Sequence, residues 1–189
     1  KKIEKLMKYE TAGDPMSDLK WTRKTTQKIA DALEKLLIKE GVQVLEIKGD
    51  PDPGELNKLL ENWIKDGPVN GVYWLPALDR EAELKDIEYK AWKALTHNRI
   101  KLLYHTMRQL EFLGQKVSFL VSATRLGGHF GYDEKGALAP LGGAVSGFTK
   151  AYKRENPESL VKVIDFEASR KTKALAEIII AETRADNGA

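Results

Sequence analysis

The 189-residue sequence contains no cysteine. This excludes disulfide bonds, thiol catalysis and cysteine-based zinc sites, and it agrees with a reducing compartment such as the cytoplasm. No apolar run approaches the roughly 20 residues that a membrane-spanning helix needs. Basic residues form no run either: the net charge is only +3, and Lys35 and Lys39 stand between Glu34 and Glu40. We therefore expect neither a membrane nor a nucleic acid among the partners.

What is present is the composition of an ordinary globular domain. Hydrophobic residues make up 42% of the chain and charged residues 31%, which suits one domain with a real core. Residues 1–16 predict a short helix or linker that ends in turn residues, Gly13 and Pro15. Residues 17–189 form the predicted domain. Because the sequence begins without methionine and ends in a polar tail, we expect a piece of a longer protein.

Strand patterns alternate with helix patterns along this domain. Short β-rich runs begin at Leu19, Val42, Val69, Val117 and Leu160. Amphipathic helix patterns lie at about 26–40, 55–65, 81–113, 141–154 and 171–183. The longest of them should break near Asp86 or Thr96. This alternation predicts an α/β fold: a Rossmann-like, doubly wound parallel sheet, truncated to about five to six strands, with helices on both faces.

The sequence lacks the glycines that a dinucleotide-binding fold needs between its first strand and first helix, where the backbone approaches a pyrophosphate. The corresponding connection, residues 21–26, contains none. Arg23 and Lys24 are its only candidate cofactor-binding residues, and exposed basic residues are usually just solvated. The glycines at 127, 128 and 131 lie about ten residues before the next helix, too far for a phosphate cradle. We expect this chain to bind no cofactor by itself.

Residues 117–167 follow the order strand, glycine-rich loop, helix, strand, which resembles the short-chain dehydrogenase/reductase superfamily. More narrowly, the chain is similar to the non-catalytic structural subdomain of ketoreductases from polyketide and polyunsaturated-fatty-acid synthases. The segments that carry this resemblance are Gly71–Asp79, Ser122–Arg125, Pro140–Gly143 and Tyr152–Pro157. In active members, the helix that carries Gly147 begins with a Tyr-x-x-x-Lys pair. Leu138 and Gly142 stand at those two places, and neither can donate a proton.

Three residues remain as weak candidates for a catalytic role. The resemblance places Asn98 near the asparagine that holds a water in the proton relay, and Ser122, or its neighbour Ala123, near the substrate-polarising serine. Tyr132 is the tyrosine nearest to the vacant position, but Lys135 follows it at the wrong spacing for a helical pair. We expect Asn98 to be a cap or break residue, Ser122 to bond to backbone, and Tyr132 to lie by a turn. No histidine stands with ligands at metal-binding spacing, so no metal site is predicted.

The resemblance implies a non-catalytic structural half of an NADPH-dependent β-ketoacyl reductase, inactive alone and supporting a catalytic subdomain. Its partners would be that catalytic ketoreductase subdomain and the acyl carrier protein of the parent synthase, and the parent enzyme would bind the NADPH. The alternative is a self-contained, diverged NAD(P)-dependent short-chain reductase. A scaffold half exposes an apolar patch where its partner docks, so we also expect self-association of the isolated chain.

Overall fold

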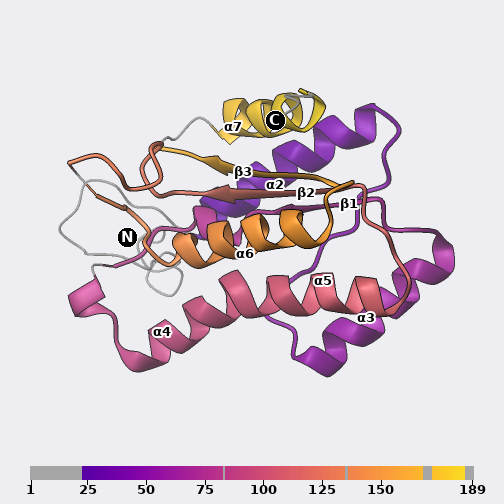
Figure 1. Ribbon diagram of the computed structural model, residues 1–189, viewed down its shortest axis with the longest axis horizontal. Helices are drawn as coiled ribbons and strands as arrows, with labels where there is room; N and C mark the ends of the chain where they lie inside the picture. The colour runs from indigo at the N-terminus through magenta and orange to yellow at the C-terminus, as the bar shows by residue number, and fades with distance from the viewer. Residues whose placement is uncertain (1–22, 83, 135, 168–171, 186–189) are drawn as a thin grey trace, which may run out of the picture.

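The structure is a computed structural model that describes residues 23–82, 84–134, 136–167 and 172–185. Three strands form a parallel sheet in the order β1 (Gly71–Trp74), β2 (Phe119–Thr124) and β3 (Leu160–Asp165). Helices cover both faces of this sheet, which gives three layers (Figure 1). The prediction of a truncated, Rossmann-like α/β fold with a parallel sheet is confirmed.

The described helices are α2 (Arg23–Lys39), α3 (Pro53–Asp66), α4 (Tyr89–Thr96), α5 (Leu102–Phe112), α6 (Gly142–Glu155) and α7 (Thr172–Arg184). Two 3-10 turns, η1 (Pro76–Leu78) and η2 (Leu84–Asp86), follow β1, and the π turn η3 (His97–Lys101) joins α4 directly to α5. The predicted break near Asp86 is confirmed. At Thr96 the helix does not end but widens into the π turn.

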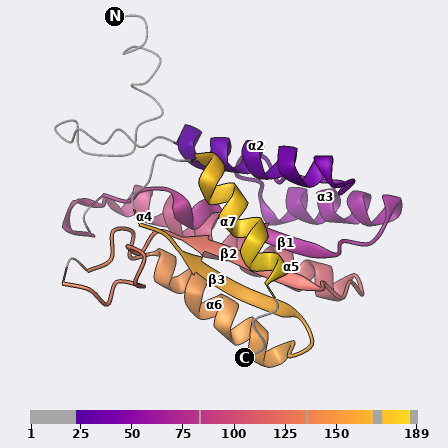
Figure 2. The same cartoon turned by 90° about the horizontal axis from the view of Figure 1, so that it is seen from above.

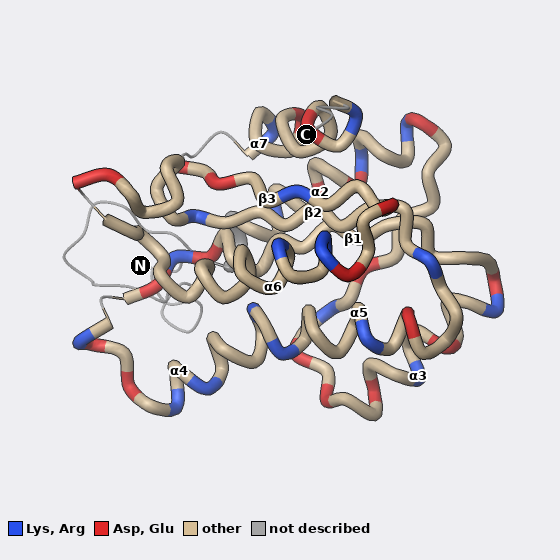
Figure 3. The backbone as a smooth tube through the Cα atoms, in the orientation of Figure 1, with Lys and Arg blue, Asp and Glu red and all other residues tan. Residues whose placement is uncertain are grey.

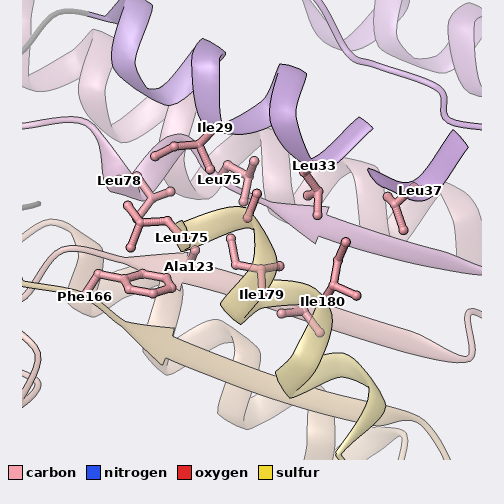
Figure 4. Close-up of a cluster of buried hydrophobic side chains, with 12 residues drawn as sticks. Ile29, Leu33, Leu37, Leu75, Leu78, Ala123, Phe166, Leu175, Ile179 and Ile180 are labelled. Carbon is pink, nitrogen blue, oxygen red and sulfur yellow. The ribbon is translucent and has the colours of Figure 1, made fainter. Parts of the chain in front are cut away.

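Helices α2 and α7 lie side by side on one face of the sheet (Figure 2). Ile29 and Leu33 of α2 and Ile179 of α7 are almost fully buried there, together with Val121 and Ala123 of β2. Figure 4 shows most of this cluster, with the side chains of α2 and α7 directed towards the same strands. The spacing of four residues on α2 places its buried side chains on one helical face, as the sequence pattern predicts.

Helices α3, α5 and α6 cover the other face of the sheet with a second hydrophobic cluster. Its fully buried members include Leu56, Leu60, Leu103, Leu110, Leu120 and Val145. Neighbouring residues of β2 therefore belong to different clusters, Leu120 to this one and Val121 to the other. This follows from the two-residue period of a strand, because β2 is central and covered on both sides.

The loop before α3 shows how local sequence sets a helix start. The Asp52 carboxylate accepts hydrogen bonds from the backbone N–H groups of Gly54 and Glu55, at 2.7 and 2.9 Å. The Glu55 side chain in turn accepts one from the Asp52 N–H at 3.0 Å. This reciprocal capping box satisfies N–H groups that the first helical turn leaves unbonded. Pro53 stands at the start of the helix, where its missing N–H costs nothing.

The predicted number of strands is wrong for the part of the chain that the structure describes. The run from Val42 to Ile47 is not a strand and joins no ladder. Instead it crosses between layers: Val44 packs against the cluster under α2 and α7, and Ile47 against the cluster under α3. Packing rather than strand pairing therefore accounts for its apolar residues. The strand expected at Leu19, like the linker of residues 1–16, lies outside the described residues.

Candidate functional site

The candidate site is the edge of the sheet where all three parallel strands end. Ligands of open α/β sheets bind outside the carboxyl ends of the strands. In this chain η1 follows β1 there, the loop from Arg125 follows β2, and Asp165 ends β3. The first turn of α6 faces the same edge, because the backbone N–H of Leu141 reaches the carboxylate of Glu81.

A buried ion pair fills this edge beside β1. Arg99 is 1% exposed and Glu81 is 5% exposed, and Nη1 of Arg99 donates to Oε1 of Glu81. Arg99 also donates through Nη2 to the Asp79 carbonyl at 2.8 Å and through Nε to the Pro76 carbonyl at 3.4 Å. Both Glu81 oxygens accept the N–H of Leu141 at 3.1 Å. The pair thus connects the segment after β1 to the π turn η3, which carries Arg99, and to the start of α6.

Burial raises the pKa of Glu81 despite the opposing effect of the Arg99 cation and of the hydrogen bond from Leu141. Desolvation penalises the charged carboxylate, whereas a neighbouring cation and a donated hydrogen bond favour it. The direction of the shift means that burial is the largest of these effects. Charge in this part of the molecule is therefore held at an energetic cost, as is usual for a buried ion pair.

Arg99 lies in the π turn η3, and its backbone carbonyl accepts a hydrogen bond from a residue of β1. The indole Nε1–H of Trp74, at the end of β1, donates to the Arg99 carbonyl at 2.8 Å. Single π turns inside α-helices are rare and are often found at functional sites. Asn98 lies in the same turn, and its buried Oδ1 has no hydrogen-bond partner within the described ranges. The sequence suggested a cap or break residue at this position. Asn98 Oδ1 caps no helix, but the residue does lie in the π turn that interrupts the α-helix between α4 and α5.

Ser122 is fully buried near the end of β2. Its hydroxyl lies 2.9 Å from the hydroxyl of Thr149 on α6, and Thr149 itself donates to the Val145 carbonyl at 2.8 Å. The expectation that Ser122 bonds to backbone is wrong, because the partner is a side chain brought close by the packing of α6 on the sheet. In this arrangement the Ser122 hydroxyl joins two elements and does not face solvent.

Asp165 organises the glycine-rich loop after β2. Its two carboxylate oxygens accept backbone N–H groups from Leu126, Gly128 and Phe130, at 2.6, 2.7 and 2.8 Å. The Thr124 hydroxyl adds a fourth hydrogen bond at 2.9 Å. The loop needs residues with positive φ, which glycines supply and which Phe130 adopts at +55°, an uncommon value for a bulky side chain. The loop is thus closed around a carboxylate of its own chain, which takes up the N–H groups of Leu126, Gly128 and Phe130.

Arg125 also faces inward from this loop and is 2% exposed. Its Nε donates to the Leu78 carbonyl at 2.8 Å. Burial lowers the pKa of Arg125 to about 10, with the carboxylates of Asp79 and Asp165 acting in the opposite direction. A second buried cation thus binds the carboxyl ends of β1 and β2 together.

The structure does not bring the predicted candidates into one site. Ser122 is buried, Tyr132 is 91% exposed, and no hydrogen bond of the described residues joins either of them to Asn98. Arg23 and Lys24 lie in the first turn of α2, and their side chains are outside the described part. Nε2 of His97 lies 3.0 Å from Oδ1 of Asp50.

The positions that resemble the Tyr-x-x-x-Lys pair do not lie on the same helix. Leu138 lies before the helix and is 44% exposed, whereas Gly142 is buried at the first position of α6. Across the described ranges, no cluster of three or more histidine or acidic side chains could hold a metal ion. None of the helices in those ranges has the length and apolarity to cross a membrane.

Sequence reasoning missed the two groups that build this edge, the Glu81–Arg99 pair and Asp165. One signal was available for Arg99. It stands on the apolar face of the long helix, four residues after Leu95 and four before Leu103. A charged residue at such a core position predicts a buried partner, but the sequence gives no indication of which carboxylate that partner is.

The fold is similar to those of solved dehydrogenase structures. A protein assigned as a short-chain dehydrogenase from Escherichia coli CFT073 matches with a TM-score of 0.59 and 13% identity, over 85% of this chain and 75% of that one. An alcohol dehydrogenase from the archaeon Thermococcus sibiricus, solved with 5-hydroxy-NADP, gives 0.56 and 12%, over 86% of this chain and 87% of that one. No family model and no curated protein matches the sequence. The chain therefore has a fold like that of the short-chain dehydrogenases.

Proposed function

We propose that the chain is the non-catalytic structural half of an NADPH-dependent β-ketoacyl reductase from a polyketide or fatty-acid synthase. One observation carries the proposal. The edge of the sheet at which such a fold holds its ligand contains a buried ion pair, Glu81 with Arg99, whose oxygens and donors are already bonded within the chain. Groups in this state stabilise structure and are not available to bind a nicotinamide or to transfer a proton.

Two further features support a scaffold role. Leu138 and Gly142 occupy the positions that resemble the catalytic Tyr–Lys pair, and general acid catalysis on a ketone needs a side chain that can donate a proton. The Ser122 hydroxyl is bonded to Thr149 inside the protein. On this proposal the parent enzyme binds NADPH through its catalytic subdomain, and that subdomain and the acyl carrier protein are the partners of this chain.

The alternative, a self-contained and diverged NAD(P)-dependent reductase, is favoured by one feature of the π turn. Asn98 Oδ1 is a buried acceptor without a hydrogen-bond partner in the described ranges, and a water or substrate group could satisfy it. Asn98 stands near the position of the family's relay asparagine. It would nevertheless act there without a proton donor.

Titration of the purified chain with NADPH, followed by nicotinamide fluorescence, separates the two functions. The scaffold proposal expects no saturable binding. It also expects no ketone reduction by a Leu138→Tyr/Gly142→Lys double variant whose circular dichroism matches that of the unmodified chain. Saturable binding that is weakened by Asn98→Ala would overturn the proposal in favour of the diverged reductase.

The supporting role itself has a direct measurement. The catalytic half of the parent reductase should show a higher Tm when mixed with this chain, because a partner that binds only the folded state stabilises it. A Glu81→Gln variant, which disturbs the edge of the scaffold, should give a smaller increase. An unchanged Tm at saturating concentrations of this chain would contradict a scaffold function.

A further inference from the structure

Helix α4 has an apolar face that the described part of the molecule does not cover. Tyr89 is 75% exposed, Trp92 is 40% exposed and Leu95 is half-buried; we call these three side chains the α4 face. None of the residues of α4 is buried, and neither hydrophobic cluster of the described residues includes one of them. A tryptophan in this state is unusual, because indole side chains are mostly covered in folded proteins.

The α4 face continues the stripe that η3 and α5 direct towards the core. Leu103 and Leu110 of α5 are buried, and so is Arg99 of η3. Leu95 and Trp92 precede Arg99 by four and seven residues, which places them on the same side of the helical segment. In Figure 1 α4 continues this segment at the lower left, away from the strands, and Figure 3 shows the charged residues along it. The core-facing stripe thus extends past the core, and an exposed apolar surface of this kind marks a contact site.

The N-terminal segment, which precedes the described residues, has an apolar face of similar size in its sequence. Ile3, Leu6 and Met7 recur at the spacing of one helical face, and we call them the N-terminal face. Lysines at positions 1, 5 and 8 have the same period but fall on the opposite side. A helix of nine residues is marginal by itself and needs packing of its apolar face. Its length would be about 14 Å, close to the about 12 Å of α4.

The connection between the two faces is long enough for them to meet. The described chain begins with α2, and Oγ1 of Thr26 donates to Oδ1 of Asp79 at 2.5 Å. Asp79 precedes Tyr89 by ten residues, so the start of α4 lies at most about 35 Å from Asp79. Residues 10–22, when extended, span up to about 45 Å. Residues 1–9 can therefore lie along α4.

We propose that residues 1–9 form a short amphipathic helix that docks its N-terminal face on the α4 face of the same chain. The tether is the reason to choose this occupant, because a short linker raises the effective concentration of the segment to the millimolar range. A second copy lacks this advantage and would need a specific interface of about 1,200 Å² or more, which one helix of eight residues does not provide. The inference does not depend on the proposed function, because neither face belongs to the carboxyl edge of the sheet.

Amide hydrogen exchange of the full chain tests the contact from the N-terminal side. Leu6→Asp introduces a carboxylate into the N-terminal face, so the amides of residues 89–95 should exchange about tenfold faster, the factor expected when one leucine loses its apolar cover. Lys5→Asp is the matched control, because it introduces the same side chain on the lysine side of the pattern. Its α4 amides should exchange as in the unmodified chain. Equal exchange rates at α4 in the two variants would overturn the proposal.

The same measurement tests the contact from the side of α4. Trp92→Ser removes the largest side chain of the α4 face, so the amides of residues 3–8 should exchange faster. Lys90→Ser introduces the same side chain on the other side of α4 and should leave those amides unchanged. If Trp92→Ser left the exchange of residues 3–8 unchanged, the two faces would not be in contact.

A spin label distinguishes docking within one chain from docking between chains. The chain contains no cysteine, so Lys8→Cys provides a single attachment site for a nitroxide on the lysine side of the segment. The label should selectively broaden the amide resonances of α4 in the molecule that carries it. In a mixture of nitroxide-bearing chain with 15N-labelled chain that lacks the nitroxide, the α4 resonances of the latter should stay sharp. Broadening in the mixture would place a second copy on α4 and overturn the proposal, as would the absence of selective broadening in the first sample.

Discussion

The continuous helical segment formed by η3 and α5 has an arginine on its inner face and another on its outer face, and the two have opposite environments. On the inner face Arg99 is 1% exposed and donates to the Glu81 carboxylate and to two backbone carbonyls. On the outer face Arg108 is exposed and makes no such bond with the described residues. Together with Glu81, the inner guanidinium connects the segment after β1, the π turn η3 and the start of α6. The outer one contributes little to folding and remains available for contacts with other molecules.

The physical reason for the difference is the cost of removing a charge from water. A guanidinium inside the protein must be paired and fully hydrogen-bonded, because an unpaired buried charge costs several kcal/mol. On the surface, water supplies the same bonds, and single ion pairs there contribute from about 0 to 1 kcal/mol. Substitutions on the two faces should therefore differ strongly in their effect on stability.

The largest effect is expected for Arg99→Met. This change leaves Glu81 buried without its cation and should lower the free energy of unfolding by about 3–5 kcal/mol. Arg108→Met, the same substitution on the outer face, should change it by no more than about 0.5 kcal/mol. Urea unfolding followed by tryptophan fluorescence measures both values. Similar losses in the two variants would mean that the inner ion pair has no special structural role.

A smaller loss is expected for Asp165→Asn. The amide keeps one acceptor oxygen, but its NH2 group faces N–H donors of the glycine-rich loop, so about 1.5–3 kcal/mol of stability should be lost. Asp133→Asn makes the same change in the exposed part of this loop and should be nearly neutral. Amide hydrogen exchange of Gly128 and Phe130 should become faster only in Asp165→Asn. Unchanged exchange would show that Asp165 does not hold the loop.

The pH dependence of stability provides a third comparison. Because burial raises the pKa of Glu81 above its ordinary 4.5, its contribution to folding is fully present below that value. The contribution is lost as the pH rises through the folded pKa. Arg99→Met removes the cation that lowers this pKa, so the loss should extend to higher pH, with a slope of at most about 1.4 kcal/mol per pH unit. Arg108→Met should show the same pH dependence of stability as the unmodified chain. If both variants showed the same pH dependence, Arg99 would not be the cation that lowers the pKa of Glu81.

The smallest effect is expected for Ser122→Ala. It removes one buried hydroxyl, and Thr149 keeps its hydrogen bond to the Val145 carbonyl, so the loss should be about 0.5–1.5 kcal/mol. Thr149→Val should cost about as much, and the double variant should cost less than the sum of the two single changes. Strict additivity would indicate that the two hydroxyls do not interact.

The amino-acid sequence by itself determined the elements that persist in the described structure. The apolar runs that became β1, β2 and β3, and the amphipathic runs that became α2, α3, α5, α6 and α7, are recognisable because their periods match a strand or a helix. The capping box at Asp52 is equally local. The same information predicted the parallel α/β fold, because each strand is followed by a helix that can cover the sheet.

The tertiary structure alone decided which groups meet. The run at Val42 has the composition of a strand, yet its side chains are divided between two core layers and its backbone joins no ladder. Glu81 meets Arg99 across 18 positions, and Asp165 meets the loop at Gly128 across 37. The hydrophobic period of a segment shows which of its faces is directed towards the core. It gives no information about contacts between segments that are distant in the sequence. The partners of buried charges are therefore determined only when the layers pack. The same packing determines the structure of the sheet edge on which the proposed function depends.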